Sequence, residues 1–150
     1  MHSKIAIGSD HRGFLIKEFL LSCTAFDNWT VEWVDVGAYT RERSDYPTFG
    51  AQVAQLMLSN TVDAGVLLCG NGVGMAIVAN RFKHIRAGLV WTEGLARMAK
   101  EDDNINVLVL PADCMTQEEA EQCVFAWLTG KFKGGRYAER LALIESLTNS

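Results

Sequence analysis

The segment Cys69-Gly70-Asn71-Gly72-Val73-Gly74 combines a thiol with three alternating glycines. Glycines at this spacing allow successive backbone N–H groups to converge on an anion, and a helix that begins here adds a favourable potential. The same dipoles favour the thiolate of Cys69, which can act as a nucleophile or as a base. The segment therefore predicts an oxyanion site with a reactive cysteine. The alternative interpretation of Cys69 is a small buried residue at the end of a strand.

The segment Gly8-Ser9-Asp10-His11-Arg12-Gly13 places an acid, an imidazole and a guanidinium in one turn. It is not the Gly-x-Gly-x-x-Gly fingerprint of dinucleotide-binding proteins, because bulky side chains occupy its middle positions. It is not a phosphate-binding P-loop either, because Phe14 stands where that motif has lysine. The structural alternative is that Asp10 caps the following helix and His11 lies on the surface.

Two further classes of protein are excluded by single residues. A cysteine phosphatase needs an arginine six residues after its cysteine, where this chain has Met75. A response regulator needs a carboxylate where Cys69 stands.

Arg136 and Arg140 are four residues apart on one helix face, so they can clamp a phosphate or pair with surface acids, and spacing alone favours the second interpretation.

The apolar pattern predicts the elements that must position these residues. Strands are expected at residues 4–8, 30–36, 64–69, 86–91 and 106–110, with helices at 13–25, 46–59, 93–100, 116–128 and 136–147 and a short helix ending at Asn80. Thr116 with Glu119 predicts a capping box. The alternation predicts an α/β fold, a three-layer α/β/α sandwich around a Rossmann-like five-stranded parallel sheet, with residues 1–150 as a single domain. Ligands of such sheets bind beyond the carboxyl ends of the strands.

Charge and composition limit the partners. With 14 Lys and Arg against 18 Asp and Glu, the net charge of -4 predicts no binding to nucleic acid or to an anionic membrane surface. No segment approaches the roughly 20 apolar residues of a membrane span. Four cysteines without Cys-x-x-Cys spacing predict free thiols and a cytoplasmic protein, and three scattered histidines predict no metal site.

Four blocks of the chain resemble, in order and spacing, the ribose-5-phosphate isomerase B and galactose-6-phosphate isomerase family. The blocks are Gly8-Ser9-Asp10-His11-Arg12-Gly13-Phe14, Asp45-Tyr46-Pro47, Cys69-Gly70-Asn71-Gly72-Val73-Gly74 with Ala79-Asn80-Arg81, and Gly134-Gly135-Arg136 with Arg140. The resemblance covers nearly the whole chain. It implies aldose–ketose isomerisation of a sugar phosphate, without metal or cofactor, by default of ribose 5-phosphate to ribulose 5-phosphate. It also implies a homodimer or dimer of dimers with active sites at the subunit interface.

The resemblance also implies a role for each matching residue. Cys69 is the base that moves a proton between C1 and C2 through a cis-enediolate, with Asn71 beside it where many members have Thr or Ser. The N–H groups of the loop stabilise the enediolate, and the residues that supply them are Gly70, Gly72, Val73 and Gly74. Asp10 and Tyr46 contact the sugar, while His11, Arg136 and Arg140 bind the phosphate.

The chain departs from the family pattern at two places. Members carry a His-Asn pair ahead of the fifth strand, where an ungapped count puts Asp102 and Asp103 and a one-residue deletion would put Asp103 and Asn104. We expect Asp102 to act in place of the histidine that assists ring opening, and Asp103 to contact substrate. An ordinary carboxyl group is a poor acid near pH 7, so His11 is the alternative for ring opening.

The second departure is Asp113, which stands where the family commonly has a third phosphate-binding arginine. Arg12 is the candidate that would restore the lost charge. The departures keep two alternatives open: an isomerase of another sugar phosphate (a tetrose, another pentose or a hexose), or a non-catalytic member that binds a sugar phosphate.

Overall fold

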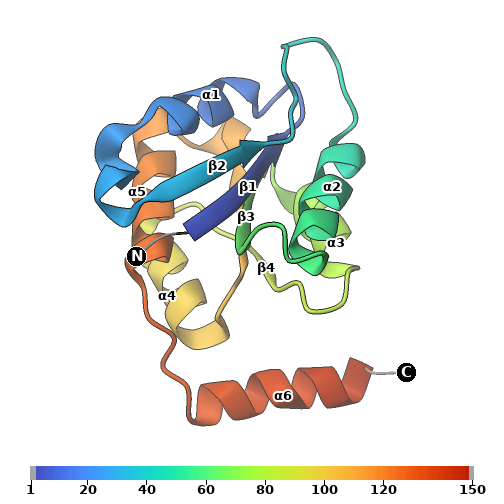
Figure 1. Cartoon of the computed structure of the whole chain (residues 1–150), viewed down its shortest axis with the longest axis vertical. Helices are drawn as coiled ribbons and strands as arrows, with labels where there is room; N and C mark the ends of the chain where they lie inside the picture. Colours follow the sequence, from blue (N-terminus) through green and yellow to red (C-terminus); the bar gives the residue numbers. More distant parts are fainter. Residues whose placement is uncertain (1–2, 149–150) are drawn as a thin grey trace.

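A computed structural model describes residues 3–148, so the first two and last two residues of the predicted domain 1–150 lie outside the described residues. Five strands form one parallel sheet in the order β2-β1-β3-β5-β4 (Figure 1). The strands are β1 (Ser3–Ser9), β2 (Val31–Asp35), β3 (Ala64–Cys69), β4 (Ala87–Leu89) and β5 (Val107–Pro111). The predicted five-stranded parallel sheet is confirmed.

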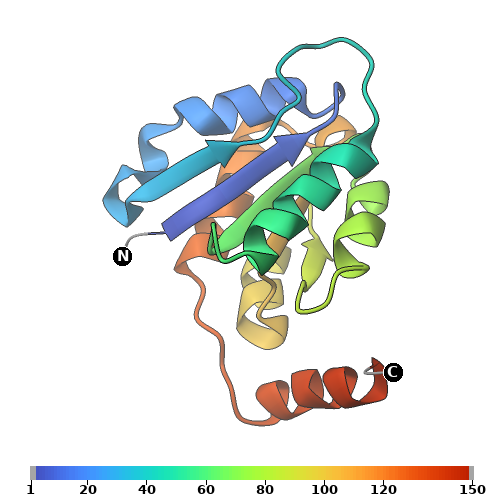
Figure 2. The same cartoon turned by 45° about the vertical axis from the view of Figure 1, so that its right-hand side comes forward.

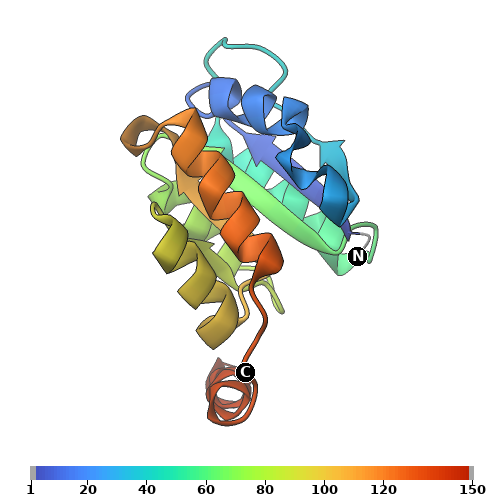
Figure 3. The same ribbon diagram turned by 90° about the vertical axis from the view of Figure 1, so that its left-hand side faces the viewer.

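Helices cover both faces of the sheet. They are α1 (Phe14–Ser22), α2 (Tyr46–Leu58), α3 (Val73–Asn80), α4 (Glu93–Asp103), α5 (Gln117–Thr129) and α6 (Arg136–Thr148), with short 3-10 turns η1 (Thr24–Trp29) and η2 (Ala112–Cys114). One apolar core lies between the sheet and α1, α4 and α5, and the other lies under α2 and α3 (Figures 2 and 3). These two cores are the reason for the three layers, because each face of a parallel sheet must be covered.

Several predicted boundaries shift. The helix predicted at 13–25 ends at Ser22, because Cys23 adopts an extended conformation with φ -69° and ψ 127°. The fourth strand is shorter than predicted, and α4 continues to Asp103, where Asn104 ends it in the left-handed conformation. Asp102 and Asp103 therefore belong to the last turn of α4. The capping box of Thr116 and Glu119 is confirmed at the start of α5.

The order of the strands sets where the two glycine-containing turns meet. From β1 the chain crosses to β2 on one side and later to β3 on the other, which creates a switch point between β1 and β3. Ser9 and Leu68 are partners in the register of these two strands. The turn that follows Ser9 and the loop that follows Cys69 are consequently neighbours.

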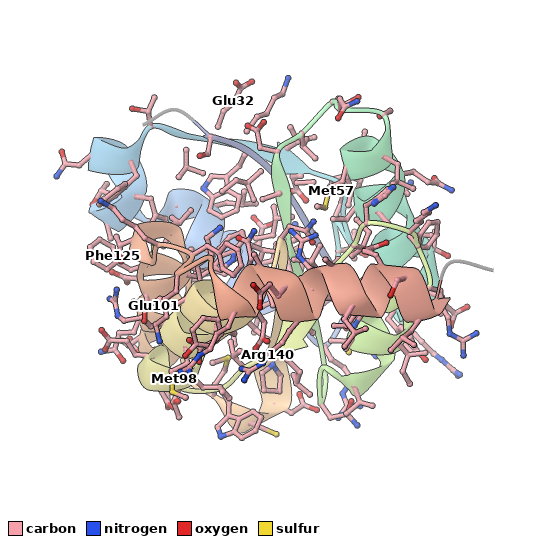
Figure 4. All side chains as sticks on the ribbon, turned by 90° about the horizontal axis from the view of Figure 1, so that it is seen from below. Glu32, Met57, Met98, Glu101, Phe125 and Arg140 are labelled. Atoms are coloured by element: carbon pink, nitrogen blue, oxygen red, sulfur yellow. The ribbon has the colours of Figure 1, made fainter. Side chains whose placement is uncertain are left out.

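Helix α6 stands apart from the three layers. It lies beyond the amino ends of the strands and touches α4, as Figures 1 and 3 show. None of its described residues is buried, and Leu143, Ile144 and Leu147 are more than half exposed. Figure 4 shows it crossing in front of the molecule seen from below. Between residues 3 and 148, no helix has the length and apolar character needed to cross a membrane.

Candidate active site

Cys69 lies at the carboxyl end of β3, directly before the glycine loop. The residue is 4% exposed and belongs to the core on the α2 and α3 side of the sheet. Gly72 precedes α3 and has φ +79°, a conformation that side chains rarely adopt. The first N–H groups of a helix have no acceptor within it, so the start of α3 presents donors beside the cysteine. The predicted helix start after the glycine loop is confirmed, and binding of an oxyanion there stays a prediction.

The side chain of Asn71 accepts a hydrogen bond from one of these N–H groups. Its Oδ1 accepts a hydrogen bond from the N–H of Val73 at 3.0 Å. The N–H of Val73, which we expected to face an anion, is therefore occupied by the chain itself. The N–H groups of Gly74 and Met75 come next in the first turn of α3.

The glycine spacing serves a second purpose that the sequence did not reveal. At Gly70 an added Cβ would lie 2.3 Å from Cζ of Arg12, and at Gly74 it would lie 2.4 Å from Cζ of Tyr46. At Gly72 it would lie 2.3 Å from Cδ1 of Leu89. Each glycine thus lets one side chain lie against the loop, and two of these side chains, Arg12 and Tyr46, are polar.

Asp10 caps the turn after β1. The residue is 5% exposed, and its Oδ1 accepts hydrogen bonds from the N–H groups of Arg12 at 2.9 Å and Gly13 at 3.2 Å. The N-cap of α1 is Gly13, and no side chain caps that helix, so Asp10 closes the turn before α1 instead of capping the helix. A contact of Asp10 with a sugar stays a prediction. These two hydrogen bonds hold the backbone of the turn that contains His11.

His11 is oriented by Ser44. The backbone N–H of His11 donates to Oγ of Ser44 at 3.1 Å, and Nδ1 of His11 accepts from the backbone N–H of Ser44 at 3.2 Å. Because Nδ1 is an acceptor, the proton of the neutral ring is on Nε2. Nε2 of His11 therefore carries an N–H that takes no part in these two hydrogen bonds, and a contact with a phosphate stays a prediction.

An ion pair with a fully buried lysine joins α1 to the end of β2. Lys17 of α1 is fully buried, and its Nζ lies 2.9 Å from both carboxylate oxygens of Asp35 at the end of β2. Asp35 also accepts a hydrogen bond from the N–H of Gly37 at 2.9 Å, and its backbone oxygen accepts from the Tyr39 hydroxyl at 2.9 Å. Sequence reasoning missed this pair; the available signal was a lysine among the apolar positions of a helix.

The other predicted site residues lie together at the opposite end of the molecule, in α4 and α6. Asp102 accepts a hydrogen bond from Lys133 at 2.7 Å, and that bond raises the pKa of Lys133. The guanidinium groups of Arg136 and Arg140 lie 5.3 Å and 5.5 Å from the ring centre of Tyr137. The hydrogen bond that Arg136 donates to the Tyr137 hydroxyl lowers the pKa of Tyr137.

This second group lies around the end of α4 and the start of α6, beyond the amino ends of the strands. In Figure 4 Arg140 projects from α6, with Glu101 of α4 near one end of that helix. Cys69 is the last residue of β3 and therefore lies at the opposite, carboxyl end of the strands. Within one chain the structure does not bring Asp102, Asp103, Arg136 or Arg140 to Cys69.

Asp113 lies beside the glycine loop and the turn after β1. Its backbone N–H donates to the oxygen of Gly70 at 2.9 Å, and its carboxylate accepts a hydrogen bond from Nη2 of Arg12. Arg12 therefore points at the glycine loop, as a residue that restores positive charge there must do. Its charge, however, is opposed by Asp113.

One cavity of the molecule lies away from Cys69. It has a volume of about 800 Å³ and lies between α6 and the segment around β4, with Phe82, Ile85, Leu141 and Ile144 in its wall. Among residues 3–148 no cluster of three or more His, Cys, Asp or Glu side chains could hold a metal ion.

Comparisons with known proteins agree on one family. The family model described as Ribose/Galactose Isomerase matches residues 5–144. The chain is 36% identical to ribose-5-phosphate isomerase B of Escherichia coli over 144 residues, which are 96% of this chain and 95% of that protein.

Solved structures agree as well. A ribose 5-phosphate isomerase from Thermotoga maritima has a TM-score of 0.90 and 41% identity, with 97% of this chain and 99% of that chain covered. Ribose-5-phosphate isomerase B from Mycoplasma genitalium, solved with bound ribulose 5-phosphate, has a TM-score of 0.89 and 34% identity, with 98% and 97% covered.

Proposed function

The chain belongs to the ribose/galactose isomerase family, and from this membership we propose that it interconverts an aldose phosphate and the corresponding ketose phosphate. Ribose 5-phosphate and ribulose 5-phosphate are the proposed substrate pair. The observation that carries the proposal is the position of Cys69, a thiol at a strand end beside the N-terminus of α3 and its glycine loop. This substrate pair implies that the protein is an enzyme of the pentose phosphate pathway in the cytoplasm.

Isomerisation needs a base and a stabiliser for the negative charge that follows. In the proposed reaction the thiolate of Cys69 removes the proton from C2 of the open aldose, and the electrons of the C–H bond form a C1–C2 double bond. The charge moves to O1, where N–H groups at the start of α3 stabilise it. The proton of the O2 hydroxyl then passes to O1, the C1–C2 double bond takes the proton of the thiol at C1, and O2 becomes the ketose carbonyl, which regenerates the thiolate.

Side chains around Cys69 supply the contacts with the sugar. Tyr46 lies against Gly74 and Asp10 lies in the adjacent turn, so both are suited to hydrogen-bond sugar hydroxyls. His11 presents its Nε2–H as a donor for the phosphate. We retain Asn71 as a positioning residue for the loop, because its side chain holds the N–H of Val73.

The remaining predicted residues require a second copy of the chain. Asp102, Asp103, Arg136 and Arg140 lie together but away from Cys69, and α6 exposes the apolar side chains Leu143, Ile144 and Leu147. We propose a homodimer, alone or within a dimer of dimers, in which this second group completes the site of the partner. The arginines of one copy would then grip the phosphate, and Asp102 would act in ring opening beside Cys69 of the other.

Subunit mixing tests the shared site. Cys69→Ala and the double variant Arg136→Ala/Arg140→Ala should each be inactive alone. A re-associated equimolar mixture should recover up to about a quarter of the activity, because half of the dimers are mixed and each mixed dimer has one intact site. Failure to recover activity, with mixed dimers demonstrated by mass spectrometry, would contradict the shared site.

The reaction itself is tested with a panel of aldose and ketose phosphates in deuterated water, followed by NMR. Ribose 5-phosphate should convert to ribulose 5-phosphate with deuterium entering at C1. Conversion of a tetrose or hexose phosphate instead would favour the alternative of a different substrate, which the departures at Asp102 and Asp113 motivate. No conversion of any panel member, together with binding of the sugar phosphates, would favour the non-catalytic alternative.

A further inference from the structure

Two opposite charges from distant parts of the chain meet over Gly70. Arg12 follows β1 and Asp113 follows β5, 101 residues later, and Nη2 of Arg12 donates a hydrogen bond to Oδ2 of Asp113. The Arg12 guanidinium lies so close to Gly70 that an added Cβ there would be 2.3 Å from Cζ and 2.6 Å from Nε and Nη1. The pair therefore lies on the residue that directly follows Cys69.

The backbone fixes both members of the pair. The N–H of Arg12 donates to Asp10 at 2.9 Å, and the N–H of Asp113 donates to the oxygen of Gly70 at 2.9 Å. Their side chains are nevertheless 55% and 41% exposed. The pair is thus held in place at the rim of the site while it stays accessible to a ligand. An exposed pair of this kind contributes little to stability, so stability is a poor reason for its presence.

The electrostatic consequence is specific. A lone guanidinium beside Gly70 would add a positive charge to a loop that already favours anions, one residue away from His11. Asp113 cancels that charge at short range. We infer that the Arg12–Asp113 pair determines how strongly the site attracts the phosphate of its substrate, and that Asp113 holds this attraction below what Arg12 alone would produce. The inference rests on the proposed function and assigns a specificity-determining role to both residues.

The charge model predicts effects of opposite sign. A unit charge a few ångström from an anion in a partly hydrated site changes affinity by about tenfold. Asp113→Asn frees Arg12 and should lower the dissociation constant of inorganic phosphate about tenfold. Arg12→Gln leaves Asp113 unpaired and should raise it about tenfold. The double variant has no net charge there, as in the unmodified protein, and should return to within about twofold of the original value.

The test is titration of the full-length protein and its variants with inorganic phosphate at low salt, by calorimetry or phosphorus NMR. Glu32→Gln is the matched control, because it changes the net charge equally at the amino end of β2 (Figure 4) and should leave phosphate affinity unchanged. The gain from Asp113→Asn should shrink in about 0.5 M salt because of screening. Asp113→Ser is a second neutral variant if the first is poorly folded.

Several results would overturn the inference. These are single variants that shift affinity in the same direction, an Asp113→Asn protein with unchanged phosphate affinity or no phosphate binding, and a Glu32→Gln shift as large as that of Asp113→Asn. The KM for ribose 5-phosphate should change in parallel with the phosphate affinity. If the unmodified protein converts no sugar phosphate, the proposed function fails, while the phosphate titrations still decide the role of the pair.

Discussion

The contact between Gly74 and Tyr46 offers a sharp test of how the glycine loop works. An alanine Cβ at Gly74 would lie 2.4 Å from Cζ, 2.6 Å from Cε2 and 2.8 Å from the hydroxyl of Tyr46. Since carbon atoms pack at about 3.5 Å, the ring must move by about 1 Å. A displacement of this size at a substrate-positioning group can cost about 100-fold in rate. We therefore expect Gly74→Ala to lower kcat/KM by about 10- to 100-fold.

Stability should not follow activity in this variant. Gly74 is the second residue of α3 and its φ is not positive, so alanine improves helix propensity by up to about 1 kcal/mol, against the cost of moving an only half-buried ring. The matched control is Gly94→Ala, because Gly94 is the second residue of α4 and has nothing within 4 Å of an added Cβ. Gly94→Ala should raise the melting temperature slightly and leave kcat/KM unchanged.

The assay is the steady-state conversion of ribose 5-phosphate, with melting temperatures measured in parallel. A Tyr46→Ala background supplies the decisive comparison. If the loss arises from displacement of the ring, Gly74→Ala should add little further loss once the ring is absent. Full activity of Gly74→Ala, or an equal loss in the Tyr46→Ala background, would refute the reasoning.

Three further outcomes are expected. Asp35→Asn leaves the fully buried Lys17 without its main partner and should cost about 3 kcal/mol in the free energy of unfolding, measured by urea denaturation; a cost below 1 kcal/mol would show that the pair is not a structural support. Ser44→Ala removes the acceptor for the His11 N–H and should raise KM several-fold with little change in kcat, whereas an unchanged KM would separate His11 from phosphate binding. Burial, aided by nearby glutamates, raises the pKa of both Cys23 and Cys123 to about 11, so at pH 8 iodoacetamide should label exposed Cys114 at least tenfold faster than either, as followed by peptide mass spectrometry. Equal labelling rates would contradict the raised pKa of those two thiols.

The sequence predicted the elements whose residues have a strong pattern. The apolar run Ala64–Cys69 is a central strand with the expected bounds, because a strand buried on both faces needs continuous apolar residues. The Thr116 capping box marks the start of α5, since it is a local interaction. The end of α1 and the length of α4 were predicted less well, because backbone conformations at Cys23 and Asn104 decide them.

The site was predicted in part for similar reasons. Cys69 and the glycine loop could be proposed from the sequence because alternating glycines before a helix are typical of an anion site, but the side chains that these glycines accommodate could not. Lys17 and Asp35 were missed, because a lysine in a helix is ordinarily exposed and its partner lies 18 residues away. The orientation of His11 by Ser44 depends on a segment without helical or strand periodicity, so no sequence pattern predicts this contact.

The position of α6 could not be predicted from the sequence either. Its amphipathic pattern predicts a helix, but only the structure shows that Arg136 and Arg140 lie far from Cys69 within one chain. Because α6 buries none of its described residues, packing within one chain gives no strong reason for its position, and contacts with a second copy would supply one. The shared-site proposal follows from this placement.

The central claim is that Cys69 is the base of an aldose–ketose isomerase. It is tested most directly by proton NMR of ribose 5-phosphate in deuterated water with the unmodified protein and with Cys69→Ala at equal concentration. We predict formation of ribulose 5-phosphate by the unmodified protein and a rate at least about 100-fold lower for the folded variant, because the proton-transferring group is gone. Conversion by Cys69→Ala at the rate of the unmodified protein would contradict the account.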